Sequence, residues 1–153
     1  MASTSVASSR SLREPKLFFP GLSGFYGWVE PYSYLLMRVA VGLTLLPIGW
    51  NKLLGGLGPV AATMAKYGIA PSAPAAFCVI AIESVGGLCI AFGLLTRFWA
   101  AAFAIEMAVI SAIKMPSGYF PMQPFLLLGI LAFSIALRGG SRFSLDRTLG
   151  WEL

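Results

Sequence analysis

The sequence predicts an all-α membrane protein, a four-transmembrane-helix bundle over residues 32–137 with a short interfacial helix after the first span. Two properties of the composition indicate this class: 58% of the 153 residues are hydrophobic and only 11% are charged, and the mean hydropathy is +0.80. The third observation is that the apolar residues form long blocks, separated by short stretches rich in glycine, proline or charge. Because a bilayer core needs about 20 consecutive apolar residues per helix, these blocks are expected to span a membrane.

The first elements follow from the order of these blocks. Residues 1–16 are polar and rich in serine, and residues 17–31 gather aromatic side chains among prolines and glycines. We therefore expect 1–31 to form a cytoplasmic tail and an interfacial aromatic segment. The first span is predicted at Tyr32–Lys52, about the 20 residues that a bilayer core requires. Residues 59–68 begin with proline and end with glycine, which predicts a short helix on the membrane surface.

Three further spans are predicted in the second half. The second covers Ala75–Leu95, and the apolar run Phe98–Ile113 follows almost directly. One helix over both runs would exceed about 55 Å, nearly twice the roughly 30 Å hydrocarbon core, so a tight turn is expected at Thr96–Arg97. The fourth span is predicted at Met122–Leu137. Residues 138–153 are mixed and basic, and we expect them to form a cytoplasmic C-terminal tail.

The basic residues predict how the spans are oriented. Most of them lie singly at the edges of apolar blocks, which indicates lipid headgroups as their counterpart and argues against nucleic acid. On the side of both termini lie seven, namely Arg10, Arg13, Lys16, Arg97, Arg138, Arg142 and Arg147, and on the other side three, Lys52, Lys66 and Lys114. Because cytoplasmic loops carry the excess of lysine and arginine, both termini are expected in the cytoplasm.

An acidic residue lies deep in the second span. Glu83 is near the predicted middle of the bilayer, and Gly86 and Gly87 follow it at three and four positions. On a helix the two glycines share its flank and allow a neighbouring helix to come close. An ionisable group at this depth is costly and usually faces a partner or a cavity. Glu83 is therefore either part of a functional site or one half of a structural ion pair.

The first span carries a basic face that could supply the partner. Four residues lie within about 40° of this face, namely Arg38, Gly42, Gly49 and Lys52. The third span adds a second acid, Glu106, about 11 Å from its cytoplasmic end, and Arg38 lies about 9 Å from that end of the first span. Arg38 is therefore expected to pair with Glu106 or Glu83.

One cation that faces two acids leaves a carboxylate that is either protonated or paired with a bound molecule. The candidate quinone or proton site consists of Arg38, Lys52, Glu83 and Glu106. Such a group could donate to a quinone carbonyl, relay a proton or close the bundle. The alternative is that Arg38 and Glu106 each reach the headgroups independently.

The residue types exclude several other kinds of site. The chain has no histidine, which removes imidazole bases and the usual ligands of haem and zinc. Cys78 and Cys89 lie 11 positions apart, about 16 Å along a helix, so they cannot bond to each other, and we expect both to be inert. No catalytic residue and no metal ligand is predicted. No intrinsic cofactor is expected, and a bound quinone or lipid is the remaining candidate.

Four ordered stretches carry a family pattern. They are LLMRVAVGLTLLPIGWNKLLGG, ESVGGLCIAFGLLTRFWAAAFAIEM, KMPSGYF and RGGSRFSLDR. Together, over roughly residues 34–147, they resemble the DoxX family of small four-helix bacterial membrane proteins. The matching positions are Arg38, Gly42, Gly49, Lys52, Glu83, Gly86, Gly87, Thr96, Arg97, Gly118, Ser144 and Asp146.

Two departures from the family pattern concern histidine. The family commonly has histidine before the glycine that corresponds to Gly49, where this chain has Ile48. It has another before the Pro-x-Gly-aromatic turn, where this chain has Lys114 and Met115. Any role that depends on these histidines is therefore lost.

The resemblance implies an integral membrane subunit of DoxX type, accessory to a quinone-linked redox complex, because family members resemble subunits of thiosulfate:quinone oxidoreductase and of other membrane redox complexes. It implies a non-catalytic subunit in the bacterial plasma (inner) membrane, with membrane lipids and other membrane proteins as partners. Two alternatives stay open. One is a purely structural or assembly subunit of a larger respiratory or photosynthetic complex, docked through the aromatic segment 17–31, and the other is a small transporter or proton channel.

Overall fold

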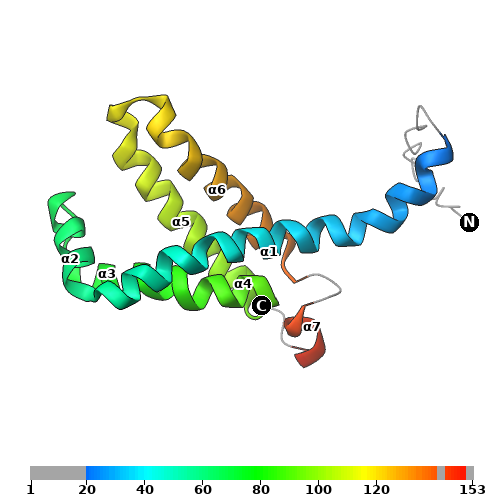
Figure 1. Cartoon of the computed structure of the whole chain (residues 1–153), viewed down its shortest axis with the longest axis horizontal. Coiled ribbons are helices and arrows are strands. Elements are labelled where there is room, and N and C mark those ends of the chain that lie inside the picture. The colour runs from blue at the N-terminus through cyan, green and yellow to red at the C-terminus, as the bar shows by residue number, and fades with distance from the viewer. Residues whose placement is uncertain (1–19, 141–143, 151–153) are drawn as a thin grey trace, which may run out of the picture.

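The computed structural model describes residues 20–140 and 144–150, and the regular structure of this part of the chain is entirely helical (Figure 1). The helices are α1 (Ser23–Gly55), α2 (Leu57–Lys66), α3 (Ser72–Ala81), α4 (Gly87–Phe92), α5 (Thr96–Lys114), α6 (Tyr119–Arg138) and α7 (Leu145–Leu149). A π-helical stretch, Ile82–Gly86, joins α3 to α4. Short 3-10 turns cover Pro20–Leu22 and Met115–Ser117.

Four helical segments are long and apolar enough to cross a membrane. They are Ser23–Gly55, Ser72–Phe92, Thr96–Ser117 and Tyr119–Arg138. The second consists of α3, the π-helical stretch and α4, which follow one another without a break. The four-span all-α membrane fold predicted from the sequence is confirmed, and the short helix expected after the first span is α2.

α1 is the element on which the others pack. α4 and the π-helical stretch lie along it, and α2 folds back onto α3. α5 and α6 form a hairpin, and these two helices contact each other more extensively than any other pair of elements. Figure 1 shows this hairpin rising at an angle from α1 on the side that also holds α2, and the N-terminal part of α1 extending beyond the rest of the bundle. The spans therefore diverge at the end that holds α2.

All four spans begin earlier than predicted, the second at Ser72 instead of Ala75 and the third at Thr96 instead of Phe98. α1 starts at Ser23 instead of Tyr32, so the aromatic segment is helical and continuous with the first span from Ser23 onward. α6 starts at Tyr119 instead of Met122. The segments added to α1 and α6 both contain proline, which limits a helix only when its missing N–H or its ring disturbs the preceding turn. In α6 the proline lies in the first turn, where backbone N–H groups have no helical partner.

The turn between the second and third spans also lies slightly earlier than predicted. Thr96 and Arg97 begin α5, and the chain reverses over the three residues before them. Gly93 and Leu95 both have a left-handed backbone, with φ of 78° and 47°. Glycine adopts this conformation at no steric cost, and it commonly ends a helix in this way.

The largest buried cluster lies where α1, α4, α5 and α6 meet. Its buried members are Tyr34, Val41, Leu45, Ile90, Ala100, Phe103, Met107, Ala132 and Ile135. A smaller cluster of Val60, Ala76 and Ile80 joins α2 to α3. Many large apolar side chains, such as Leu36, Phe120 and Leu137, are exposed on the outer faces. This distribution is expected of helices that face lipid on their outer side.

Glycines set the distance between α1 and the second span. A Cβ atom on Gly42 would lie 2.6 Å from the carbonyl oxygen of Gly87, and one on Gly49 would lie 2.5 Å from the backbone nitrogen of Ser84. A Cβ atom on Gly86 would lie 2.8 Å from an aromatic ring carbon of α5. Side chains do not fit at these distances, so the helices approach closely only because glycine occupies these positions.

Replacing Gly49 by alanine is expected to destabilise the protein by about 1–3 kcal/mol, because the added methyl group must push two backbones apart. Gly55→Ala, at the end of the same helix, is the matched control, since a Cβ atom there has no atom within 4 Å. Thermal unfolding in detergent compares the two variants with the parent protein. Equal melting temperatures for the two variants would contradict the close approach at Gly49.

Candidate functional site

Three charged side chains from three elements come together beside α1. The Nζ of Lys52, near the end of α1, donates to Oε1 of Glu83 at 2.5 Å. Glu106, from the middle of α5, interacts electrostatically with both of them. We call Lys52, Glu83 and Glu106 the acid–lysine cluster. The structure therefore joins three of the four residues predicted for a quinone or proton site.

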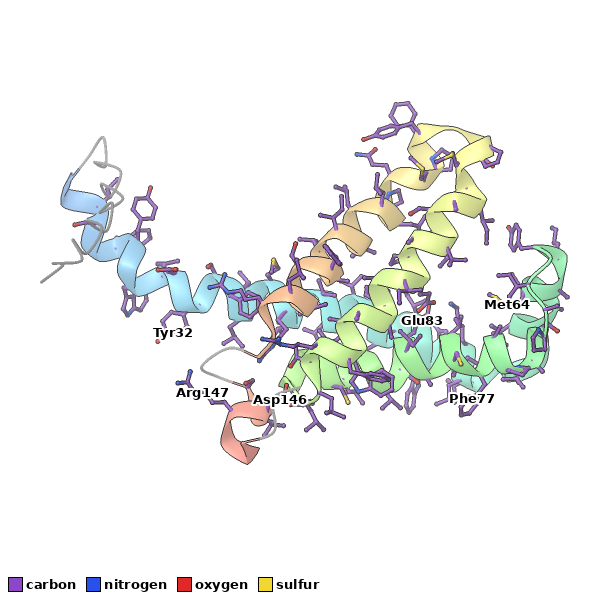
Figure 2. All side chains as sticks on the ribbon, turned by 180° about the vertical axis from the view of Figure 1, so that it is seen from behind. Tyr32, Met64, Phe77, Glu83, Asp146 and Arg147 are labelled. Carbon is purple, nitrogen blue, oxygen red and sulfur yellow. The ribbon has the colours of Figure 1, made fainter. Side chains whose placement is uncertain are left out.

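The π-helical stretch gives Glu83 its place in the cluster. Ile82–Gly86 departs from α-helical hydrogen bonding, and the hydroxyl of Ser84 donates to the carbonyl oxygen of Ile80 at 2.5 Å. The backbone of Glu83 lies against Gly49 of α1. Figure 2 shows Glu83 where α5 crosses this stretch. Single π-helical turns inside helices occur frequently at functional sites, and the sequence carries no signal for this one.

Three oxygen atoms of the cluster receive no hydrogen bond from a donor group among the described residues, apart from one that the carboxyl groups of Glu83 and Glu106 can share through a proton. They are Oε2 of Glu83 and both carboxyl oxygens of Glu106. The exposed fractions of the two residues are only 3% and 8%. A buried polar atom without a partner costs about 1–3 kcal/mol. Such a group in a native protein calls for a bound donor or for a functional role.

A cleft opens directly beside the cluster. Its volume is about 520 Å³, and both Lys52 and Glu106 line it. One wall comes from α2, α3 and the residues between them, and the other from α5; the cleft thus lies in the region where Figure 1 shows these elements diverging. Apolar side chains form most of both walls, among them Met64, Val79, Ile82, Val109, Ile110 and Ile113. A mostly apolar cleft of this size with a few polar groups is typical of a small-molecule site.

A second cavity lies on the outer side of the α5–α6 hairpin. Its volume is about 640 Å³, and its lining is apolar except for Arg97 at one end and Ser111. The hydroxyl of Ser111 already donates to the carbonyl oxygen of Met107 at 2.7 Å. This cavity contains no buried charged group, so the smaller cleft is the stronger candidate for a specific site.

Arg38 does not join the cluster, which corrects the predicted pairing with Glu83 or Glu106. Its side chain is fully buried at the other end of the second span, where a Cβ atom on Gly93 would lie 2.7 Å from its Nη1. Gly93 lies ten positions beyond Glu83, about 15 Å along a helix, which is beyond the reach of an arginine side chain. Because Arg38 is fully buried, it does not extend to the headgroups either.

Arg38 belongs to a second polar cluster, in which it interacts electrostatically with Tyr34 and Asp146. The carboxylate of Asp146 accepts from the backbone nitrogens of Leu95 and Thr96 at 2.6 and 3.0 Å, and from the Thr96 hydroxyl at 2.8 Å. Its own N–H donates to the carbonyl oxygen of Gly93 at 2.9 Å. Asp146 therefore caps the first turn of α5 and fastens the segment Ser144–Gly150 to the turn between the second and third spans.

The end of the bundle near Arg38 is thus closed by residues that were predicted to belong to a cytoplasmic C-terminal tail. Ser144 and Asp146 are buried, and the hydroxyl of Ser144 caps α7 by accepting from the backbone nitrogen of Arg147 at 3.4 Å. Figure 2 shows Asp146 between α7 and the bundle, with Arg147 farther from it. The available signal was the N-cap pattern Ser-Leu-Asp, which starts a helix in an otherwise basic segment.

Four helices long and apolar enough to cross a membrane, with a buried acid–lysine cluster between them, define a multi-pass integral membrane protein. The family model described as DoxX matches residues 33–114, which is more than half of the chain. The chain belongs to the DoxX family. The match contains the whole acid–lysine cluster and leaves α6 and α7 outside. No curated protein and no solved structure matches the chain.

Removing Lys52 alone is expected to be worse than removing Lys52 and Glu83 together, because a buried carboxylate without its cation costs about 3–5 kcal/mol. The variants are Lys52→Met, Glu83→Leu and the double variant, and the measurement is thermal unfolding in detergent. The matched control is the cycle of Arg38→Met with Glu83→Leu, whose losses should add within about 0.5 kcal/mol. Additive losses in the Lys52 cycle would show that the ion pair does not stabilise the fold.

Asp146→Ala is expected to destabilise the protein by about 2–4 kcal/mol, because three hydrogen bonds to a buried carboxylate are lost. Glu30→Ala is the control, since Glu30 is exposed on α1 and surface substitutions usually change stability by less than about 0.5 kcal/mol. Trypsin cleavage after Arg147 should also become faster in the Asp146 variant. Unchanged stability and unchanged cleavage would contradict the docking of this segment.

Proposed function

We propose that this DoxX-family protein is an accessory membrane subunit of a quinone-linked redox complex, and that its cleft holds the quinone headgroup. The observation that carries the proposal is the cleft of about 520 Å³ with Lys52 and Glu106 in its lining. A quinone combines a ring that bears polar oxygens with a long apolar tail. The cleft offers the same combination, because Lys52 and Glu106 lie beside mostly apolar walls.

Lys52 suits the recognition of a ring oxygen. An ammonium group has three donors, and the described structure uses one of them, for Oε1 of Glu83. The side chain is about one-third exposed, at 31%, so its remaining N–H groups can reach a ligand in the cleft. Hydrogen bonds from a charged donor are roughly twice as strong as neutral ones.

The redox centre is assigned to a partner protein. The chain has no histidine, and its two cysteines lie in one helical segment, so the ordinary ligands of haem and of iron–sulfur clusters are missing from the sequence. We therefore assign to this chain a non-catalytic role, in which it holds or delivers quinone. We also propose that it resides in the bacterial inner membrane with both termini in the cytoplasm, which the excess of arginine at the end near Arg97, Arg138 and Arg147 supports.

A second candidate, a structural or assembly subunit, is favoured by the N-terminal part of α1. This helix has 33 residues, about 50 Å at 1.5 Å per residue, and a bilayer core needs roughly 30 Å. Phe25, Tyr26 and Trp28 are exposed on the extension. Aromatic residues are enriched at protein interfaces and at the headgroup level, so this extension suits docking on another subunit.

The first test is quinone retention. Val109→Trp places a large ring on the α5 wall of the cleft, whereas Leu127→Trp places the same ring on an exposed face of α6 that lines neither cavity. After purification in mild detergent, organic extraction and chromatography should find quinone with the parent protein and with Leu127→Trp, and at least about fivefold less with Val109→Trp. Equal quinone in all three preparations would place the quinone outside the cleft.

Mass spectrometry of the same preparations separates the candidate roles. Co-purifying redox subunits together with bound quinone favour the accessory role. Co-purifying subunits without quinone favour the structural role, and an isolated homo-oligomer favours a small transporter.

A further inference from the structure

The partnerless atoms of the acid–lysine cluster are all oxygen atoms. Glu83 contributes one and Glu106 contributes two; no donor group within residues 20–140 and 144–150 reaches them, although the two carboxyl groups can share a proton in a hydrogen bond to each other. Both side chains are more than nine-tenths buried, and Glu106 lines the cleft. An oxygen atom in apolar surroundings is satisfied only by a hydrogen-bond donor. The chemistry of the site is therefore set by acceptors.

This excess of acceptors does not depend on how many protons the cluster holds. If both carboxyl groups are ionised, all three oxygens are acceptors and none is a donor. If one carboxyl group carries a proton, it donates that proton to the other carboxyl group, and the second oxygen of Glu106 remains an acceptor without a donor. Lys52 uses one of its N–H groups for Oε1 of Glu83, and its other N–H groups can donate to a ring oxygen of quinone and quinol alike. In either state, the buried oxygen of Glu106 requires a donor that a ligand hydroxyl can supply.

We infer that the cleft selects the reduced form of its quinone, the hydroxyl-bearing quinol, with a quinol hydroxyl donating to the carboxyl group of Glu106. This inference rests on the proposed function and names the form of the ligand that the site takes. A quinone ring carries carbonyl acceptors and no O–H donor, so it leaves the buried oxygens unsatisfied. A quinol offers two O–H donors on a ring of nearly the same shape.

The remaining polar groups of the lining are compatible with this orientation. Thr63, Tyr67 and Lys114 also line the cleft, and Lys114 lies eight positions beyond Glu106 on α5, about 12 Å along the helix axis. A ring that meets Glu106 is thus separated from Lys114 by about two helical turns with apolar side chains, such as Val109, Ile110 and Ile113. These side chains can cover the ring and the start of the tail.

Cys78 provides a native reporter for occupancy. It is exposed and lines the cleft, whereas Cys89 does not line it. In a Cys89→Ala background, the rate of alkylation of Cys78 by N-ethylmaleimide can be followed by intact mass under anaerobic conditions. Three probes are compared: a decyl-tailed, fully ring-substituted benzoquinone, its quinol, and the dimethyl ether of that quinol, which lacks both O–H groups and is larger by two methyl groups.

The quinol is expected to slow alkylation at a concentration about tenfold or more below that needed by the quinone or the ether. A tenfold difference corresponds to about 1.4 kcal/mol, the order of one hydrogen bond to a buried charged group. Glu106→Gln replaces one acceptor oxygen by a donor, so the preference should shrink to less than about threefold. Val109→Trp should abolish protection by all three probes, and Leu127→Trp should leave it unchanged.

The outcomes separate this inference from the function on which it rests. Equal protection by quinol and quinone, or stronger protection by the quinone, overturns the selection of the reduced form and leaves the quinone cleft in place. Protection by none of the probes overturns both. If Glu106→Gln does not fold, the comparison of the quinol with the quinone in the parent protein decides the question by itself.

Discussion

The ion pair between Lys52 and Glu83 is the constraint on which the centre of the molecule depends. A carboxylate at membrane depth has no water to solvate it, and its unpaired charge costs several kcal/mol. The cation reaches it at 2.5 Å because α1 runs directly against the π-helical stretch, and α1 can do so because position 49 has no side chain. The pairing of Lys52 with Glu83 therefore depends together on the contact between α1 and the second span, on the glycine at position 49 and on the π-helical stretch.

The pair also explains why Glu106 is left as the chemically available group. With Lys52 committed to Glu83, the second carboxyl group of the cluster receives no cation of its own among the described residues. A bundle built only for stability would replace such a group by an apolar side chain, because a buried group without a partner destabilises the fold. Glu106 instead lies on the wall of a cleft, where the proposed ligand would give its carboxyl group a hydrogen-bond partner.

The four spans could be predicted from the sequence because length and hydropathy determine them, and the glycine contacts could be predicted from their spacing to Glu83. The cation that pairs with Glu83 could not be predicted in this way. The position of each residue along its own helix favoured Arg38. Which residues of two helices meet depends, however, on how the helices pack against each other. Lys52 was placed at the membrane surface, although its long side chain can turn inward from a helix end. The docking of Asp146 was missed because its neighbours are basic and polar, as in a solvated tail.

The two polar clusters divide the molecule by role. The cluster of Arg38 and Asp146 ties α1, the turn after α4 and α7 to one another. The acid–lysine cluster lies about 15 Å away along the second span and opens on a cleft. The same helices thus have a closed end and an end with a cleft.

The docking of Asp146 has a consequence for biogenesis. This residue comes after the fourth span in the chain, so it leaves the ribosome after all the helices that it fastens. Before Asp146 is synthesised, the guanidinium of Arg38 lacks the carboxylate that lies near it in the folded protein. Closure of this end of the bundle therefore follows the synthesis of all four spans, and its final step belongs to the short segment Ser144–Gly150.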